Sequence, residues 1–100
     1  MIRPVLTFSR HGLTGEVAKL GFRVVGHIMA SQGRQQKAAW QVVLQDWPLR
    51  QGPATSFKIA RGKIIEEVEE WCASAGLIDP GAGVDVRVLT EPEETVRARA

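Results

Sequence analysis

The feature that most constrains the fold is residues 60–76, ARGKIIEEVEEWCASAG, which show an unambiguous helical period. Apolar residues recur there at intervals of three and four and form one wide stripe. The stripe contains Ile64, Ile65, Val68, Trp71, Cys72 and Ala75. Gly76 fits the glycine position that follows a helix end. Because such a helix buries its stripe against another element, we expect a sheet beneath it, with Trp71 buried between the two layers.

The beginning of this helix is less clearly marked than its end. A start at Ser56 would place Lys58, Arg61 and Lys63 near the positive end of the helix dipole, which is unfavourable by about 0.3–1 kcal/mol for each charge. A start near Ala60 avoids this and leaves Gly62 in the first turn. We therefore predict the later start.

Two segments, residues 22–30 and 38–46, have the alternation of β-strands, and the polar loop 31–36 between them suits a hairpin. The even-numbered residues of both strands are expected to face the helix. The odd-numbered residues would then form an uncovered sheet face, because one helix covers one side only. That face would carry Arg23, Val25, His27, Met29, Lys37, Gln41, Val43, Gln45 and Trp47.

Further strands are predicted at residues 2–8, where Pro4 favours an edge or a strand start, and at 84–89. Residues 14–20 are interpreted as irregular or briefly helical, with a strand as the alternative. Residues 49–53 are expected to form a loop. Residues 54–59 are its continuation, a short fourth strand or the first helical turn.

These elements predict an α+β two-layer sandwich, with a mainly antiparallel sheet of about four strands and one major helix on one face. If residues 14–20 are helical, the order is the βαββαβ of ferredoxin-like domains; if not, the chain is a meander with one helix across it. We expect one domain over residues 1–90, followed by a polar tail or short helix at 91–100.

The net charge of +2 hides an asymmetry along the chain. Residues 1–63 carry a net charge of +8, whereas residues 64–100 carry −6. Such a division can mark an anionic partner for the basic half, or the two halves can neutralise each other in space. The N-terminal residues lack the apolar run of a signal peptide, and no apolar span is long enough for a membrane helix, so a cytoplasmic location is expected.

Signals of enzymatic chemistry are weak. His11 and His27 have no partner at metal-ligand spacing, and Cys72 lies on the apolar stripe, where a small buried residue is expected. Arg61-Gly62-Lys63 lacks the other residues of a phosphate-binding loop. We therefore expect no cofactor and no metal, and a small-molecule-binding protein or enzyme is the least favoured class.

Two features indicate binding: the uncovered face and a basic rim around the hairpin and the helix start. Basic side chains neutralise phosphates, aromatic rings stack on bases, and mixed faces also form dimers. The residues expected to bind nucleic acid or another anion are Arg23, Arg34, Lys37, Trp47, Arg50, Lys58, Arg61 and Lys63. Val25, Met29 and Val43 are expected at a homodimer interface. The first hypothesis is a non-catalytic nucleic-acid-binding or regulatory accessory protein, with DNA or RNA as partner. The alternative is a homodimeric interaction module without nucleic acid.

The portion with three strands followed by a helix, ending in TSFKIARGKIIEEVEEW, resembles the arm-type DNA-binding domains of phage and transposon integrases in layout. The resemblance rests on this order of elements and on residues 55–58 before the helix. It implies that a sheet enters a DNA groove while the helix supports it from behind. The additional strand after the helix departs from that pattern, so the likeness is one of architecture.

Overall fold

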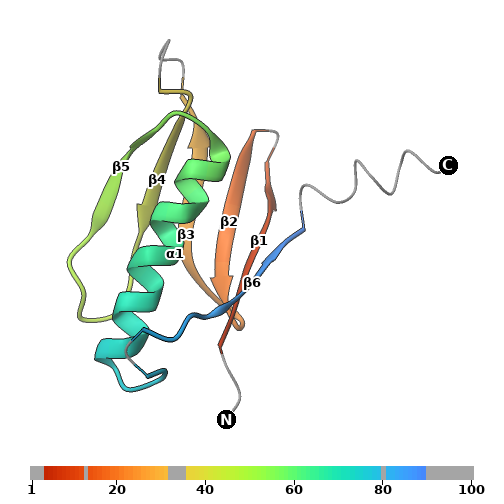
Figure 1. The fold of residues 1–100 in the computed structure, drawn as a ribbon. Coiled ribbons are helices and arrows are strands. Elements are labelled where there is room, and N and C mark those ends of the chain that lie inside the picture. Colours follow the sequence, from red (N-terminus) through yellow and green to blue (C-terminus); the bar gives the residue numbers. More distant parts are fainter. Residues whose placement is uncertain (1–3, 13, 32–35, 80, 90–100) are drawn as a thin grey trace, which may run out of the picture.

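The computed structural model describes residues 4–12, 14–31, 36–79 and 81–89, which form six strands and one helix (Figure 1). The strands are β1 (Val5–His11), β2 (Gly15–Leu20), β3 (Arg23–Ala30), β4 (Ala38–Val42), β5 (Arg50–Ala54) and β6 (Asp85–Val88). The helix is α1 (Phe57–Ser74). The expected tail at 91–100 and the site residue Arg34 lie outside the described residues.

The first five strands follow one another as an antiparallel meander, and α1 then carries the chain back across the sheet (Figure 1). The strand order is β5-β4-β3-β2-β1-β6, with β6 parallel to β1. A parallel neighbour requires a crossover, and α1 provides it. The two-layer α+β class with one helix on one face is therefore confirmed, with six strands rather than about four.

Two segments that the sequence analysis assigned differently are strands. Residues 15–20 form β2, which lies between β1 and β3, and residues 50–54 form β5 at the sheet edge. Pairing explains both, since β2 bonds to strands on either side and β5 bonds to β4. With β2 in place of a helix, the chain follows the meander alternative.

The helix begins at Phe57, so the predicted start near Ala60 is wrong. The Ser56 side chain accepts a hydrogen bond from the Ile59 backbone N–H at 3.1 Å and caps the first turn. The predicted end is confirmed, because helical residues stop at Ser74 and Gly76 has the left-handed φ of 78° expected after a helix end.

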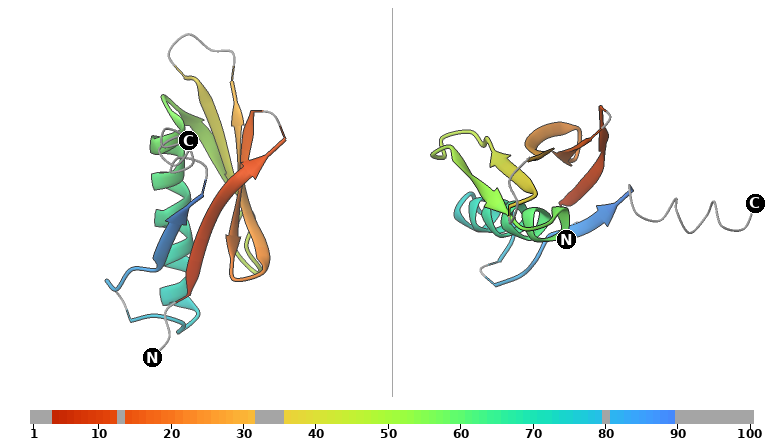
Figure 2. Two further views of the ribbon diagram at one scale, coloured as in Figure 1. Left: turned by 90° about the vertical axis from the view of Figure 1, so that its right-hand side faces the viewer. Right: turned by 90° about the horizontal axis from the view of Figure 1, so that it is seen from above.

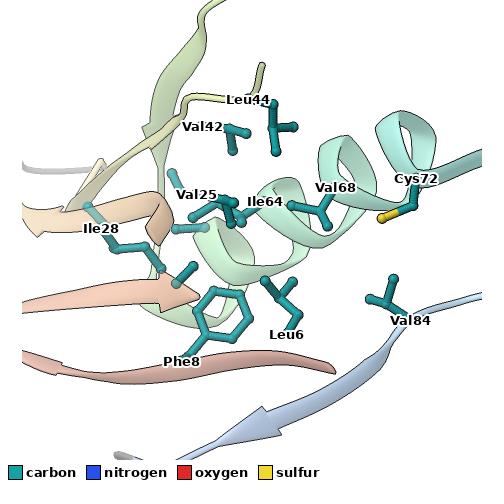
Figure 3. Packing of buried hydrophobic residues seen from close by; sticks show 14 of the residues in the cluster. Leu6, Phe8, Val25, Ile28, Val42, Leu44, Ile64, Val68, Cys72 and Val84 are labelled. Carbon is teal, nitrogen blue, oxygen red and sulfur yellow. The ribbon is translucent and has the colours of Figure 1, made fainter. Parts of the chain in front are cut away.

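The core lies between α1 and the sheet (Figure 3). Ile64, Val68 and Cys72 are fully buried at intervals of four, and they belong to one buried cluster with Leu6 and Phe8 from β1. These contacts confirm the apolar stripe. Trp71 departs from expectation because it is only half-buried, with its indole N–H donating to the Gln45 carbonyl oxygen at 3.0 Å.

A β-bulge in β3 moves the residues before it, Arg23 and Val24, to the faces opposite those that strict alternation predicts. Ala18 pairs with Gly26, but Lys19 pairs with Val24, so Val25 is the additional residue. Val25 is 2% exposed on the helix side, and its assignment to the uncovered face is wrong. The inward orientation expected for Phe22 and Val24 is wrong for the same reason, since both are exposed.

In the part of the chain that the structure describes, no helix has the length and apolar character needed to cross a membrane.

Candidate functional site

Among the residues that the structure describes, no layer packs on the side of the sheet opposite α1, and we call this side the uncovered face (Figure 2). Strand register assigns it residues from all six strands. They are Val5, Thr7, Ser9, His11, Gly15, Val17, Lys19, Val24, His27, Met29, Ala39, Gln41, Gln51, Pro53, Asp85 and Arg87. Seen from above in Figure 2, the sheet curves around the helix, so this face is convex.

The cations of this face lie beside one another. Thr7 on β1 pairs with Lys19 on β2 and with Arg87 on β6, so Lys19 and Arg87 stand two strands apart, roughly 10 Å. Both side chains are exposed. Lys37, also exposed, directly precedes β4. Among the described residues, the carboxylate whose register places it on this side is Asp85, at the β6 edge.

The centre of the uncovered face carries mostly polar side chains and no Lys, Arg, Asp or Glu among its described residues. One cross-strand row joins Ser9, Val17, His27, Gln41 and Gln51. His27 also meets His11 edge-to-face, with ring centroids 5.7 Å apart across β2. Hydroxyl, imidazole and carboxamide groups both donate and accept hydrogen bonds, so this row offers the mixed pattern that reads base edges.

The predicted basic rim does not form one patch. Arg61 is buried and makes a two-point ion pair with Glu16 of β2, in which Nε donates to Oε1 at 2.8 Å. The expected role of Arg61 in anion binding is therefore corrected, because its guanidinium is paired with the Glu16 carboxylate and this pair joins the helix to the sheet. No local pattern indicates this pair, because its members are 45 positions apart in the chain.

Trp47 and Arg50 both lie against Glu67 of α1. The Trp47 indole N–H donates to Glu67 Oε1 at 3.3 Å, and Arg50 Nε is 3.5 Å from the same oxygen. Trp47 is therefore on the helix side, not at the rim of the uncovered face. Regular alternation ends with β4 at Val42, so the odd-even rule does not extend to this residue.

The remaining predicted cations are divided between different surfaces. Lys58 and Lys63 are exposed on the N-terminal half of α1, away from the uncovered face. Arg23 precedes the bulge and pairs with Leu20, which places it on the helix side. Met29 is on the uncovered face and Val43, just after β4, is exposed.

Two cations of the uncovered face escaped the sequence analysis. Lys19 lay in a segment interpreted as irregular, and Arg87 lay on a strand whose neighbour was unknown. The alternation of Glu16, Ala18 and Leu20 with Val17 and Lys19 was the signal available for the first. No local signal existed for Arg87, because the pairing of β6 with β1 is a property of the whole chain.

No cluster of three potential metal ligands occurs among residues 4–12, 14–31, 36–79 and 81–89. Burial, with a smaller contribution from the Glu69 carboxylate, raises the pKa of the Cys72 thiol. A raised pKa keeps the thiol protonated and unreactive. Glu69 Oε2 itself accepts the Val84 backbone N–H at 3.0 Å, so this helix acid has a structural role.

No family model matches this chain, and comparison with curated proteins and with solved structures finds no match either.

Proposed function

We propose that the protein is a non-catalytic nucleic-acid-binding protein that presents its uncovered face to a duplex. The observation that carries the proposal is the composition of that face. It holds exposed cations and a central row rich in hydrogen-bonding side chains, with its carboxylate at one edge. The four glutamates of α1 belong to the opposite layer.

The cations of the face suit a backbone of phosphates. Lys19 and Arg87 flank Thr7 in one cross-strand row. Lys37 lies towards the opposite edge of the sheet. Cations that contact phosphates release counterions, so binding weakens as salt rises, with a slope of about −0.9 for each phosphate neutralised.

The shape and chemistry of the face favour a duplex over a single strand. A convex sheet fits a groove, and the major groove of B-DNA accepts β-strands. Single strands are bound through aromatic stacking platforms. Among the residues assigned to the uncovered face there is no Phe or Trp, because Trp47 is held at Glu67 on the other side. The carboxamides of Gln41 and Gln51 are suited to base edges.

The test is fluorescence anisotropy with a labelled duplex of mixed sequence and the corresponding single strand, at about 50 and 200 mM salt. We expect Lys19→Gln and Arg87→Gln each to weaken duplex binding and to reduce the salt slope by about 1. Lys58→Gln and Lys63→Gln are matched controls that make the same charge change on the helix layer, and these should leave both quantities unchanged.

Absence of salt-dependent binding at micromolar protein would refute the proposal. Equal losses in the helix-layer controls would show attraction by overall charge and would also refute it. Stronger binding of the single strand would contradict the choice of a duplex.

A homodimer through the uncovered face has less support. Val25 is buried beneath the helix, and the polar row containing His27 and Gln41 separates Met29 from the end of β4 where Val43 lies. The apolar residues expected at the interface therefore do not form one patch. Sedimentation of wild type and Val43→Arg tests this alternative, which requires a dimeric wild type.

A further inference from the structure

A hollow of about 460 Å³ opens at the end of the sheet, where the C-terminal half of α1 meets the ends of β2, β3 and β4. Its apolar walls are the side chains of Leu20, Val24, Val25, Val43, Leu44 and Trp71. Arg23 and Gln45 complete the lining. The volume falls within the range of small-molecule sites, which combine apolar walls with a few polar groups.

The helix lies close to the sheet near the middle of β3 and lines the hollow farther along. At Gly26 the helix lies against the β3 backbone, since a side chain there would meet Ile64 Cδ1 at 3.4 Å. Two turns later the half-buried Trp71 lines the hollow, with its indole N–H bonded to the Gln45 carbonyl oxygen. The bulge brings Val25 and Arg23 to the same lining.

Arg23 is the charged residue of this lining. Its exposed guanidinium has no ion pair or hydrogen bond with another described residue. The lining includes no carboxylate. An apolar hollow with one unpaired cation complements a molecule that has an apolar body and a single negative charge, because guanidinium binds carboxylate through two parallel hydrogen bonds.

We propose that this hollow is a binding site for a small aliphatic carboxylate, of the medium-chain fatty-acid class. Its hydrocarbon chain lies between Trp71 and the valine and leucine walls, and its carboxylate pairs with Arg23 at the mouth. The site shares Val24 with the uncovered face but none of the cations assigned to that face, and its occupation does not depend on nucleic-acid binding.

The test is an NMR titration with decanoate, kept below its micelle concentration, that follows the indole N–H signals. The Trp71 signal is assigned with Trp71→Phe. Decanoate should shift it saturably, and Arg23→Gln should weaken binding by about tenfold, as loss of a charge-assisted pair implies. Decanol should bind wild type and Arg23→Gln equally. Lys58→Gln, a cation removed elsewhere on the surface, should leave decanoate binding unchanged.

Val43→Phe narrows the mouth of the hollow from an exposed position, so the fold should tolerate it while decanoate and decanol both lose affinity. Non-saturating shifts, or equal decanoate affinity in wild type and Arg23→Gln, would overturn the proposal. A Trp71 shift that follows protein concentration without ligand would also overturn it, because the occupant would then be a second copy of the chain.

Discussion

The two faces of the sheet are made by the same strands, yet they handle charge in opposite ways. On the covered face Arg61 is buried, and the two-point pair with Glu16 compensates it. On the uncovered face Lys19 and Arg87 remain in solvent, and register brings them to one cross-strand row. A buried charge needs a partner inside the protein, whereas an exposed one is available to a partner outside.

This difference teaches that the number of cations along the chain is a poor guide to a binding surface. The cations of residues 1–63 lie in four different places. Arg61 forms the internal pair and Arg50 contacts Glu67, whereas Arg23 lines the hollow and Lys19 lies on the uncovered face. Among the described residues, the cations on the side without a helix are the ones that we propose contact phosphates. Substitutions made separately on the covered face and on the uncovered face test this difference between buried and exposed cations.

The largest expected effect comes from removing half of the buried pair. Arg61→Met should destabilise the protein by about 3–5 kcal/mol, because the Glu16 carboxylate loses its guanidinium partner in a buried site. Replacing both residues, Glu16→Leu with Arg61→Met, should recover most of that loss. Urea unfolding measures both variants.

The control for this experiment is Lys19→Met on the uncovered face, which should change stability by no more than about 0.5 kcal/mol. A large loss in Lys19→Met, or a double variant as unstable as Arg61→Met, would remove the contrast between the two faces.

A smaller effect is expected where the helix touches the sheet backbone. In Gly26→Ala the new methyl would lie 2.9 Å from the Gln41 carbonyl oxygen and 3.4 Å from Ile64, so we expect a loss of about 1–3 kcal/mol. Gly62→Ala is the matched control in α1, where the new methyl would meet no atom within 4 Å beyond its chain neighbours and the surrounding helix backbone. There alanine should stabilise by about 0.5–1 kcal/mol. Thermal unfolding distinguishes the two signs, and equal signs would contradict the close approach at Gly26.

The smallest effect concerns pH. Because burial raises the Cys72 pKa, the unfolded chain loses the thiol proton at lower pH than the folded protein does. Unfolding is then favoured as pH rises above about 8.5, so stability should fall in that range. Cys72→Ala should remove this part of the pH dependence, whatever its own stability at neutral pH. Denaturant midpoints across the alkaline range provide the measurement, and an unchanged slope in Cys72→Ala would count against a buried thiol.

Local patterns predicted the elements whose character depends on near neighbours in the chain. The helical stripe through Ile64, Val68 and Cys72 and the stop at Gly76 follow from spacing and from the backbone freedom of glycine. The strand containing Ala38 and Val42 follows from alternation, and both residues are buried as expected. The assignment of two layers needed no more than these signals.

The candidate sites depended on pairings that no local pattern encodes. Residues 15–20 become a strand because β1 and β3 bond to them, and Arg87 reaches the uncovered face because β6 pairs with β1. Neither of these pairings follows from the composition of the segments. Of the residues predicted to bind an anion, Lys37 is the one retained in the proposed duplex interface.

The sequence by itself determined a helix with one apolar stripe, a sheet to receive it and an excess of cations before residue 64. The tertiary structure decided which side each cation occupies. A single additional residue at Val25 exchanges the faces of Arg23 and Val24, because side chains alternate with a period of two and one insertion reverses them. The ion pair of Arg61 was likewise decided by packing, since its partner comes from β2.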